Sequence, residues 1–211
     1  MHLAEIGVKC PNCSISFKSR QIPVIMDNGY RTSELRLYFH GDQEQFEPYA
    51  VCTCPSCGMA DWATAFKRTY EEAYLVQAYL PAHLQFRTAA LAAERKGKSF
   101  YSIAQYYLYA AWCADDDGAV PQAREYRRLA IDSFHKSIMD GSCPKDKKGE
   151  IEYLIGELMR RSGDFQGASD YFRGVVSHLP GRFAIMARRL IRLAEQENLI
   201  PIDFAPEPTT S

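Results

Sequence analysis

The feature that most constrains the fold of this chain is a short cysteine motif that occurs twice. Cys10-Pro11-Asn12-Cys13 and Cys54-Pro55-Ser56-Cys57-Gly58 share the same spacing and the same internal proline. A Cys-x-x-Cys turn places two sulfur atoms on one side of a tight loop. Two such turns, brought together by a hairpin, form a tetrahedral four-thiolate site. The sequence therefore predicts a metal site whose ligands are Cys10, Cys13, Cys54 and Cys57.

Zinc is the expected metal, because closed sites of four cysteines in reducing compartments are typical of structural Zn²⁺. Iron is the main competing metal, since the same sulfur geometry suits it. Disulfide or dithiol redox chemistry is disfavoured, because the first pair leads into Ser14-Ile15-Ser16-Phe17 rather than into the helix of a βαβ unit. Four thiolates also leave no open position for an activated water, which disfavours a zinc hydrolase.

A fifth cysteine complicates the ligand assignment. Cys52 lies two residues before Cys54, so on a strand the two side chains face the same way, and Cys52 could replace Cys54 as a ligand. We prefer Cys54, because only the pair Cys54 and Cys57 has the spacing of a turn. Cys52 is otherwise a spare thiol or, like Cys113 and Cys143, a small buried apolar residue.

The segment between the two turns is predicted to be β structure. Arg31–Phe39 and Phe46–Thr53 are the expected strands, and Ile22–Met26 is a third candidate before the turn signal Asp27-Asn28-Gly29. A β unit of this size has too small a core to stay folded without its metal. We therefore assign residues 1–62 to a zinc-ribbon β domain.

From about Ala63 onward the apolar residues recur with helical spacing. Residues 63–200 are assigned to an α-helical domain, and residues 201–211, which hold three prolines, to a disordered tail. The expected helices cover residues 64–80, 82–96, 103–114, 121–138, 150–161, 165–179 and 183–193. The fold class is α+β and mostly α, with a small N-terminal β zinc ribbon followed by antiparallel helical hairpins.

The helical pairs have the spacing of tetratricopeptide (TPR) repeats. Gly156, Ala168, Phe172 and Pro180 stand at the offsets of the small, small, aromatic and proline positions of that repeat. Small residues let the two helices approach closely, the aromatic ring fills the next gap, and the proline ends the unit. The sequence thus predicts a TPR-like array of helical hairpins.

Together these features resemble an uncharacterised bacterial domain-of-unknown-function family, in which a ribbon of two Cys-Pro-x-Cys turns precedes TPR-like helices. The resemblance is carried by Cys10–Cys13, Arg31–Arg36, Val51–Ala60 and the Tyr-Leu-x-Ala-Ala-Trp stretch at 107–112. The chain departs from the usual second turn at Met59, where tyrosine is expected, and it has no glycine after Cys13. The resemblance implies no reaction, so it assigns no catalytic residue.

Two sets of residues are candidates for contacts with a partner. Tyr106, Tyr109 and Trp112 lie partly off the apolar stripe of their helix. Their simplest interpretation is burial against neighbouring helices or the ribbon, and the alternative is a groove that docks a peptide on aromatic anchors. By TPR register, the second set faces the concave side of the array and consists of Tyr153, Glu157 and Arg160.

The leading functional hypothesis is a non-enzymatic cytoplasmic adaptor that binds a protein or peptide through its helices. The charge is balanced, with 25 Lys+Arg against 26 Asp+Glu, which argues against a broad nucleic-acid-binding face. A nucleic-acid-associated ribbon remains an alternative, because several basic residues surround it: Lys9, Lys18, Arg20, Arg31 and Arg36. A thiol redox or metal sensor that uses Cys52 is another.

The sequence predicts no contact with a membrane. The N-terminus lacks the basic start and apolar core of a secretory signal. The longest uncharged run, Ser99–Ala114, is shorter than the ~20 residues that a membrane span needs, and it holds four tyrosines. A cytoplasmic location is therefore expected.

Overall fold

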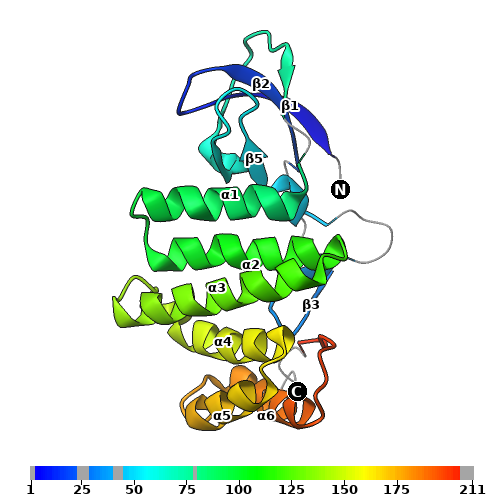
Figure 1. Ribbon diagram of the computed structural model, residues 1–211, viewed down its shortest axis with the longest axis vertical. Helices are drawn as coiled ribbons and strands as arrows, with labels where there is room; N and C mark the ends of the chain where they lie inside the picture. The colour runs from blue at the N-terminus through cyan, green and yellow to red at the C-terminus, as the bar shows by residue number, and fades with distance from the viewer. Residues whose placement is uncertain (1–2, 23–28, 40–44, 78–79, 205–211) are drawn as a thin grey trace, which may run out of the picture.

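The computed structural model describes residues 3–22, 29–39, 45–77 and 80–204. Within these residues, short strands occupy the N-terminal part and six α-helices form the remainder (Figure 1). The helices follow one another down the long axis of the molecule, with β1, β2 and β5 above α1. The fold class predicted from the sequence, mostly α with a small N-terminal β part, is confirmed.

Each cysteine turn lies at the tip of a β-hairpin. β1 (Ala4–Lys9) pairs antiparallel with β2 (Ser16–Gln21), and β5 (Val51–Thr53) pairs antiparallel with β6 (Ala60–Trp62). A four-stranded sheet has the order β7-β1-β2-β8. In that sheet β7 (Lys67–Arg68) is antiparallel to β1, and β8 (Leu75–Val76) is parallel to β2.

The expected strands differ from the observed ones in detail. Residues 31–39 do not form one strand, because β3 (Gly29–Arg31) and β4 (Leu37–Phe39) are joined by a tight turn. In that turn Leu35 has a φ of 61°. In residues 46–53, a 3₁₀ turn at Glu47–Tyr49 precedes β5. The turn forms in place of a longer strand, because the proline at its start removes a backbone donor. Of the third candidate strand, residues 23–26 lie outside the described residues.

The helix expected over residues 64–80 is wrong for the described part of that segment. A 3₁₀ turn at Ala63–Ala65 is followed by β7 and β8. These two strands complete the sheet on either edge of the β1–β2 hairpin, so sheet pairing overrides the local helical pattern. The β structure therefore continues past residue 62.

The other six helices form as predicted. They are α1 (Ala82–Arg95), α2 (Phe100–Asp116), α3 (Val120–Met139), α4 (Lys148–Ser162), α5 (Phe165–Val175) and α6 (Gly181–Glu195). Successive helices pack on one another, and α6 also contacts α4. Local signals set several ends: the Ser99 and Asp164 side chains cap α2 and α5, and Gly163 ends α4 with a φ of 92°.

Two of the four TPR-pattern residues, Gly156 and Phe172, meet in space. A Cβ atom added at Gly156 would lie 2.6 Å from the ring of Phe172, which is completely buried, so α4 and α5 approach through the missing side chain. The ring of Pro180 packs over Gly149 in the same way. The likeness of the whole array to TPR repeats remains an interpretation of the sequence pattern.

The β part packs directly on the first two helices. Val51 and Ala60 belong to the same core cluster as Phe86 of α1. The Trp62 ring stacks on that of Tyr106 with centroids 4.9 Å apart, and the Tyr106 hydroxyl donates to Asp61. Because this interface is buried and aromatic, the ribbon is joined to the helices.

The C-terminal end of the described chain is also packed. The backbone N–H of Phe204 donates to the carbonyl of Arg31 at 2.7 Å, and its ring contacts Tyr153 and Phe183. Residues 201–204 therefore depart from the disordered tail that the sequence predicts. Residues 205–211 lie outside the described residues.

Candidate metal centre and helical cavity

The four predicted ligands converge between the tips of the two hairpins. The Sγ atoms of Cys10, Cys13, Cys54 and Cys57 all lie within 4.8 Å of one another. Sγ of Cys10 is 3.7 Å from that of Cys57, and Sγ of Cys13 is 3.6 Å from that of Cys54. Four sulfurs at ~2.3 Å from one tetrahedral metal ion are about 3.8 Å apart. The arrangement therefore fits a four-coordinate metal.

The two turns have the same backbone structure. In the first, the Cys10 N–H donates to the carbonyl of Ile15 and the Ser14 N–H donates to that of Cys10, both at 2.9 Å. In the second, Cys54 and Gly58 make the equivalent bonds at 2.8 and 3.0 Å. Ser14 has a φ of 63° and Gly58 a φ of 69°. Ser14 thus adopts the left-handed conformation for which glycine is expected.

Exchanging these two residues tests the equivalence of the turns. A Cβ at Gly58 meets no atom within 4 Å, so Gly58→Ser should cost only backbone strain, about 1 kcal/mol. Ser14→Gly relieves the same strain and should raise the free energy of unfolding or leave it unchanged. Urea unfolding of the metal-loaded protein measures both. A loss above about 3 kcal/mol for Gly58→Ser would contradict the equivalence.

Hydrogen bonds and burial act on the thiols in opposite directions. The side-chain amide of Asn12 donates to Sγ of Cys57 at 3.5 Å and lowers the pKa of that thiol to about 6. Burial raises the pKa of Cys10 and of Cys54. Because metal ligation requires all four thiolates, the cation must offset this burial, and binding releases protons.

The remaining cysteines lie outside the four-sulfur cluster. Cys52 is completely buried, and its Sγ contacts the Ser19 hydroxyl at 3.5 Å. Burial raises the pKa of the Cys52 thiol to about 11. Cys113 and Cys143 are buried in the helical part. Cys52 therefore does not replace Cys54, and its thiol is protonated at neutral pH.

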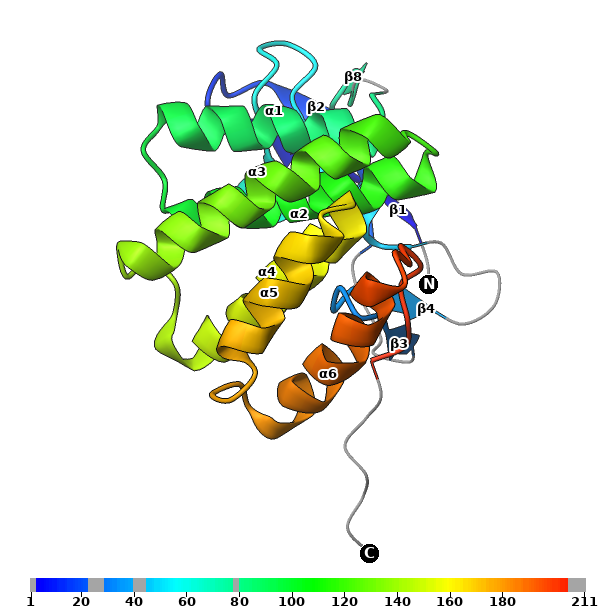
Figure 2. The same cartoon turned by 60° about the horizontal axis from the view of Figure 1, so that its bottom comes forward.

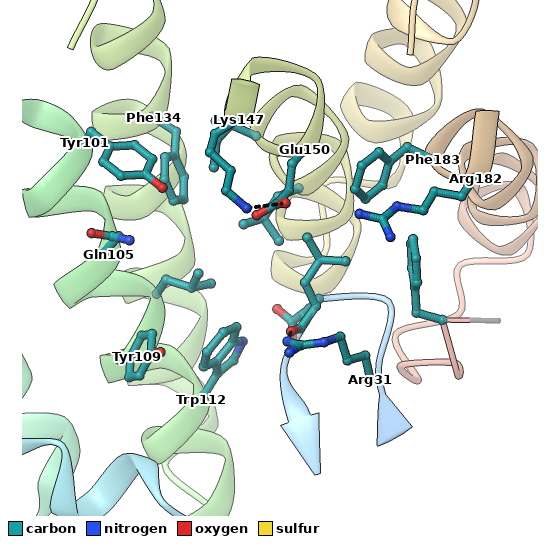
Figure 3. A pocket seen from close by; sticks show the side chains of 16 residues that line it. Arg31, Tyr101, Gln105, Tyr109, Trp112, Phe134, Lys147, Glu150, Arg182 and Phe183 are labelled. Atoms are coloured by element: carbon teal, nitrogen blue, oxygen red, sulfur yellow. Dashed lines mark hydrogen bonds and ion pairs between the residues drawn. The ribbon is translucent and has the colours of Figure 1, made fainter. Parts of the chain in front are cut away.

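A cavity of about 410 Å³ opens on the helical part, on the side of the β3–β4 turn (Figure 3). Side chains of α2 form one wall, and Arg31 and Arg182 lie on the opposite side. The lining is mainly aromatic and aliphatic: Tyr101, Leu108, Tyr109, Trp112, Phe134, Ile151, Leu154, Phe183 and Phe204. A concave apolar site with a few charged groups is the usual form of a binding pocket.

A family model described as "Uncharacterized protein conserved in bacteria (DUF2225)" matches residues 74–197. The chain belongs to this family. The matched region of this DUF2225 member begins near β8 and covers all six helices, so it includes the helical wall of the cavity. The four ligand cysteines and the lining residues Arg31, Glu34, Leu35 and Phe204 lie outside it. No curated protein and no solved structure matches the chain. Among the described helices, none combines the length and hydropathy that a membrane span requires.

The six candidate groove residues of this DUF2225 member separate into two groups. Tyr109 and Trp112 line the cavity. The other four are buried inside the molecule: Tyr106, Tyr153, Glu157 and Arg160. For Tyr106 this is the simplest interpretation given above, burial against the ribbon, whereas Tyr153, Glu157 and Arg160 do not face an open surface. Tyr106 is covered by the ribbon, and Tyr153 and Glu157 bond to Ser33 of the chain's own β3–β4 turn. Arg160 donates to the backbone carbonyls of Asn198 and Ile200.

The β3–β4 turn, residues 32–36, contacts α4, and Figure 2 shows β3 and β4 beside α6. The Tyr153 hydroxyl donates to the carbonyl of Ser33 at 2.9 Å. The Ser33 hydroxyl donates to Glu157 at 2.6 Å, and Arg160 donates to the same carboxylate. Tyr153 and Glu157 are thus bonded to a turn of this same chain.

The turn is held by buried ion pairs that the sequence did not indicate. Glu34 accepts from Arg127 at 2.7 and 2.9 Å and from Arg161 at 3.2 Å. Burial alone would raise the pKa of Glu34, but the two guanidinium groups outweigh it and hold the pKa at about 2. Arg36 pairs with Glu47 at 2.8 Å and with Asp116 at 2.5 Å. These contacts tie the N-terminal part to α2, α3 and α4.

The basic residues expected around the ribbon do not gather on one surface. Lys9 and Lys18 each pair with a glutamate, at 3.2 and 3.1 Å. Arg36 is buried and Arg31 lines the helical cavity. Of the set, Arg20 is exposed on β2. This distribution offers little continuous positive charge to a nucleic acid.

Proposed function

We propose that this chain is a cytoplasmic adaptor that binds a partner peptide in its helical cavity and uses a four-cysteine Zn²⁺ site to fold its N-terminal part. The observation that carries the proposal is the cavity itself, in which aromatic rings of α2 face two arginines. Aromatic and arginine side chains dominate the binding energy of protein interfaces. The proposal assigns no catalytic residues to the cavity.

The metal site supports a structural role. Four thiolates close the coordination sphere of Zn²⁺, and a closed site stabilises folding rather than activating water. The buried ion pairs of residues 32–36 connect the ribbon to the cavity wall, since Arg31 and Leu35 both line the cavity. A folded ribbon thus shapes the binding site.

The two alternatives have less support. A thiol sensor needs an accessible thiolate, whereas Cys52 is buried with a raised pKa. A nucleic-acid-binding ribbon needs a basic surface, whereas Lys9 and Lys18 are paired with carboxylates.

The test is selection of peptides from a random linear display library on the full-length, metal-loaded protein. Gln105→Trp places a large ring in the cavity wall. Selected peptides should bind the parent protein and lose at least roughly tenfold in affinity on this variant, because the ring occupies their site.

Gln166→Trp is the matched control, since Gln166 is exposed on α5 and does not line the cavity. It should bind the selected peptides as the parent protein does. If no peptide is enriched, or if both tryptophan variants bind every enriched peptide equally well, the adaptor proposal is wrong.

A further inference from the structure

The cavity carries positive charge that the described part of the chain does not neutralise. Glu34 and Glu150 also line it, but Glu34 is paired with Arg127 and Arg161, and Glu150 with Lys147 at 3.0 Å. Arg31 and Arg182 make no ion pair with any carboxylate of the described residues.

Both arginines are held in place while keeping donors free. The Arg31 guanidinium donates one bond to the carbonyl of Leu35 at 3.1 Å. Arg182 stacks over the rings of Phe183 and Phe204, at 4.8 and 6.0 Å from their centroids. A guanidinium has five N–H donors, so each retains donors for an anion.

The opposite wall also has an unsatisfied donor. Trp112 is only 6% exposed, and its indole Nε1 has no hydrogen-bond acceptor among the described residues. The ring lines the cavity beside Tyr109 (Figure 3). A buried N–H without a partner costs free energy, and a bound acceptor removes that cost.

The chain already shows which peptide chemistry this side of the helices accepts. In the β3–β4 turn, a carboxylate (Glu34) lies between two arginines, and the next side chain, Leu35, packs against the apolar cluster of α5 and α6. The cavity beside the turn also combines two arginines with apolar walls, but Arg31 and Arg182 have no carboxylate partner among the described residues.

We infer that the cavity recognises an acidic peptide segment in which a glutamate or aspartate stands next to an aromatic or branched apolar residue. The carboxylate binds Arg31 and Arg182, the apolar side chain packs against the α2 wall, and a peptide carbonyl accepts from Trp112 Nε1. This inference rests on the proposed function, because it names the partner class of the same site.

The test uses two defined probes, the peptides Gly-Glu-Phe-Glu-Leu-Gly and Gly-Glu-Leu-Glu-Leu-Gly, each acetylated at its N-terminus and amidated at its C-terminus. Each peptide is titrated into the ¹⁵N-labelled, metal-loaded full chain and followed by NMR. The indole N–H resonance of Trp112, distinguished from that of Trp62 by a Trp62→Phe variant, should shift on binding. Peptides with glutamine in place of glutamate should bind roughly tenfold or more weakly, since they lack the charged acceptor.

Variants of the arginines separate recognition from folding. Arg182→Gln and Arg31→Gln should each weaken the acidic peptides roughly fivefold to tenfold and leave the glutamine peptides unaffected. Arg188→Gln, an exposed change on the same helix as Arg182 and outside the cavity, should bind like the parent protein.

Two results of the peptide titrations would overturn the inference. One is that acidic and glutamine peptides bind equally, and the other is that neither acidic peptide binds. If display selection still yields cavity-dependent peptides without acidic residues, the adaptor proposal stands and only the inferred partner class is wrong. Binding that Arg182→Gln and Arg188→Gln affect equally also contradicts it.

Discussion

Replacing Cys10 or Cys54 by serine should abolish metal binding and unfold the β part of the protein. Each variant leaves three thiolates in a site whose four sulfurs converge within 4.8 Å. Zinc binding to sites of this class contributes about 10–16 kcal/mol to folding. The hydrophobic cluster around the site is small, with Val8, Phe17 and Phe66 as its largest buried apolar side chains. It cannot replace a contribution of that size.

Elemental analysis of protein purified without added metal gives the first measurement. We expect about one zinc ion per chain in the parent protein and almost none in either variant. Iron in place of zinc would keep the site but change its chemistry. Loss of the β part should also change the fluorescence of Trp62, because its ring is stacked between the ribbon and α2. The far-UV circular dichroism signal should keep most of its helical amplitude in both variants, since most helices lie away from the ribbon.

Cys52→Ala is the matched control, because Cys52 is a neighbouring buried cysteine outside the cluster. It should retain the metal and lose only the modest stability of a buried small side chain, about 1 kcal/mol. Metal loss in Cys52→Ala, with retention in Cys54→Ser, would show that the ligand assignment is wrong. Free thiols and no metal in the parent protein would remove the structural role altogether.

The parts of this fold that the sequence predicts correctly depend on local signals. The Cys-Pro-x-Cys turns specify their own backbone, so the four ligands are identifiable without knowing the strands that carry them. The helices have a clear 3.6-residue period. The Gly156 and Phe172 pair is predicted by its spacing and is realised as a close approach of α4 and α5.

The parts that the sequence does not predict depend on distant partners. β7 and β8 form only because β1 and β2 offer free edges, and nothing in residues 67–76 encodes that pairing locally. Glu157 and Arg160 have the spacing of an ordinary surface ion pair on a helix, yet both are fully buried. Glu157 bonds to Ser33 of the β3–β4 turn, and Arg160 bonds to the carbonyls of Asn198 and Ile200. In a sequence, charged residues are normally interpreted as solvent-facing, so the hydropathy pattern does not predict that a charged turn is buried.

Glu34→Gln should be among the most destabilising changes outside the metal site. It removes a buried negative charge from between Arg127 and Arg161 and keeps the size of the side chain. Breaking a buried ion pair costs about 3–5 kcal/mol, because the remaining charge is left without its partner. Asp115 still pairs with both arginines, which places the expected loss near the lower end of that range. Urea unfolding at neutral pH, followed by circular dichroism, measures it.

The matched control is Glu195→Gln, which removes an ion pair between two half-exposed side chains, Arg173 and Glu195. Its expected cost is below about 1 kcal/mol, because solvent screens exposed pairs. Equal losses in the two variants would mean that residues 32–36 do not tie the ribbon to the helices.

The pH dependence of the same variant provides a test that does not rely on the absolute stability. The pKa of Glu34 is lowered from about 4.5 to about 2 in the folded protein, so the unfolded chain binds the proton first as pH falls. The contribution of Glu34 to the free energy of unfolding is therefore complete above pH 4.5 and disappears as pH drops toward 2, a difference of about 3 kcal/mol.

Other groups also titrate in this range, since burial raises the pKa of Glu47 and Glu157 and acid releases the metal, but both effects are common to parent and variant. The stability difference between parent and Glu34→Gln should hence stay constant from neutral pH down to about 5 and shrink below it. A difference that is independent of pH would show that Glu34 acts through its size and not through its charge.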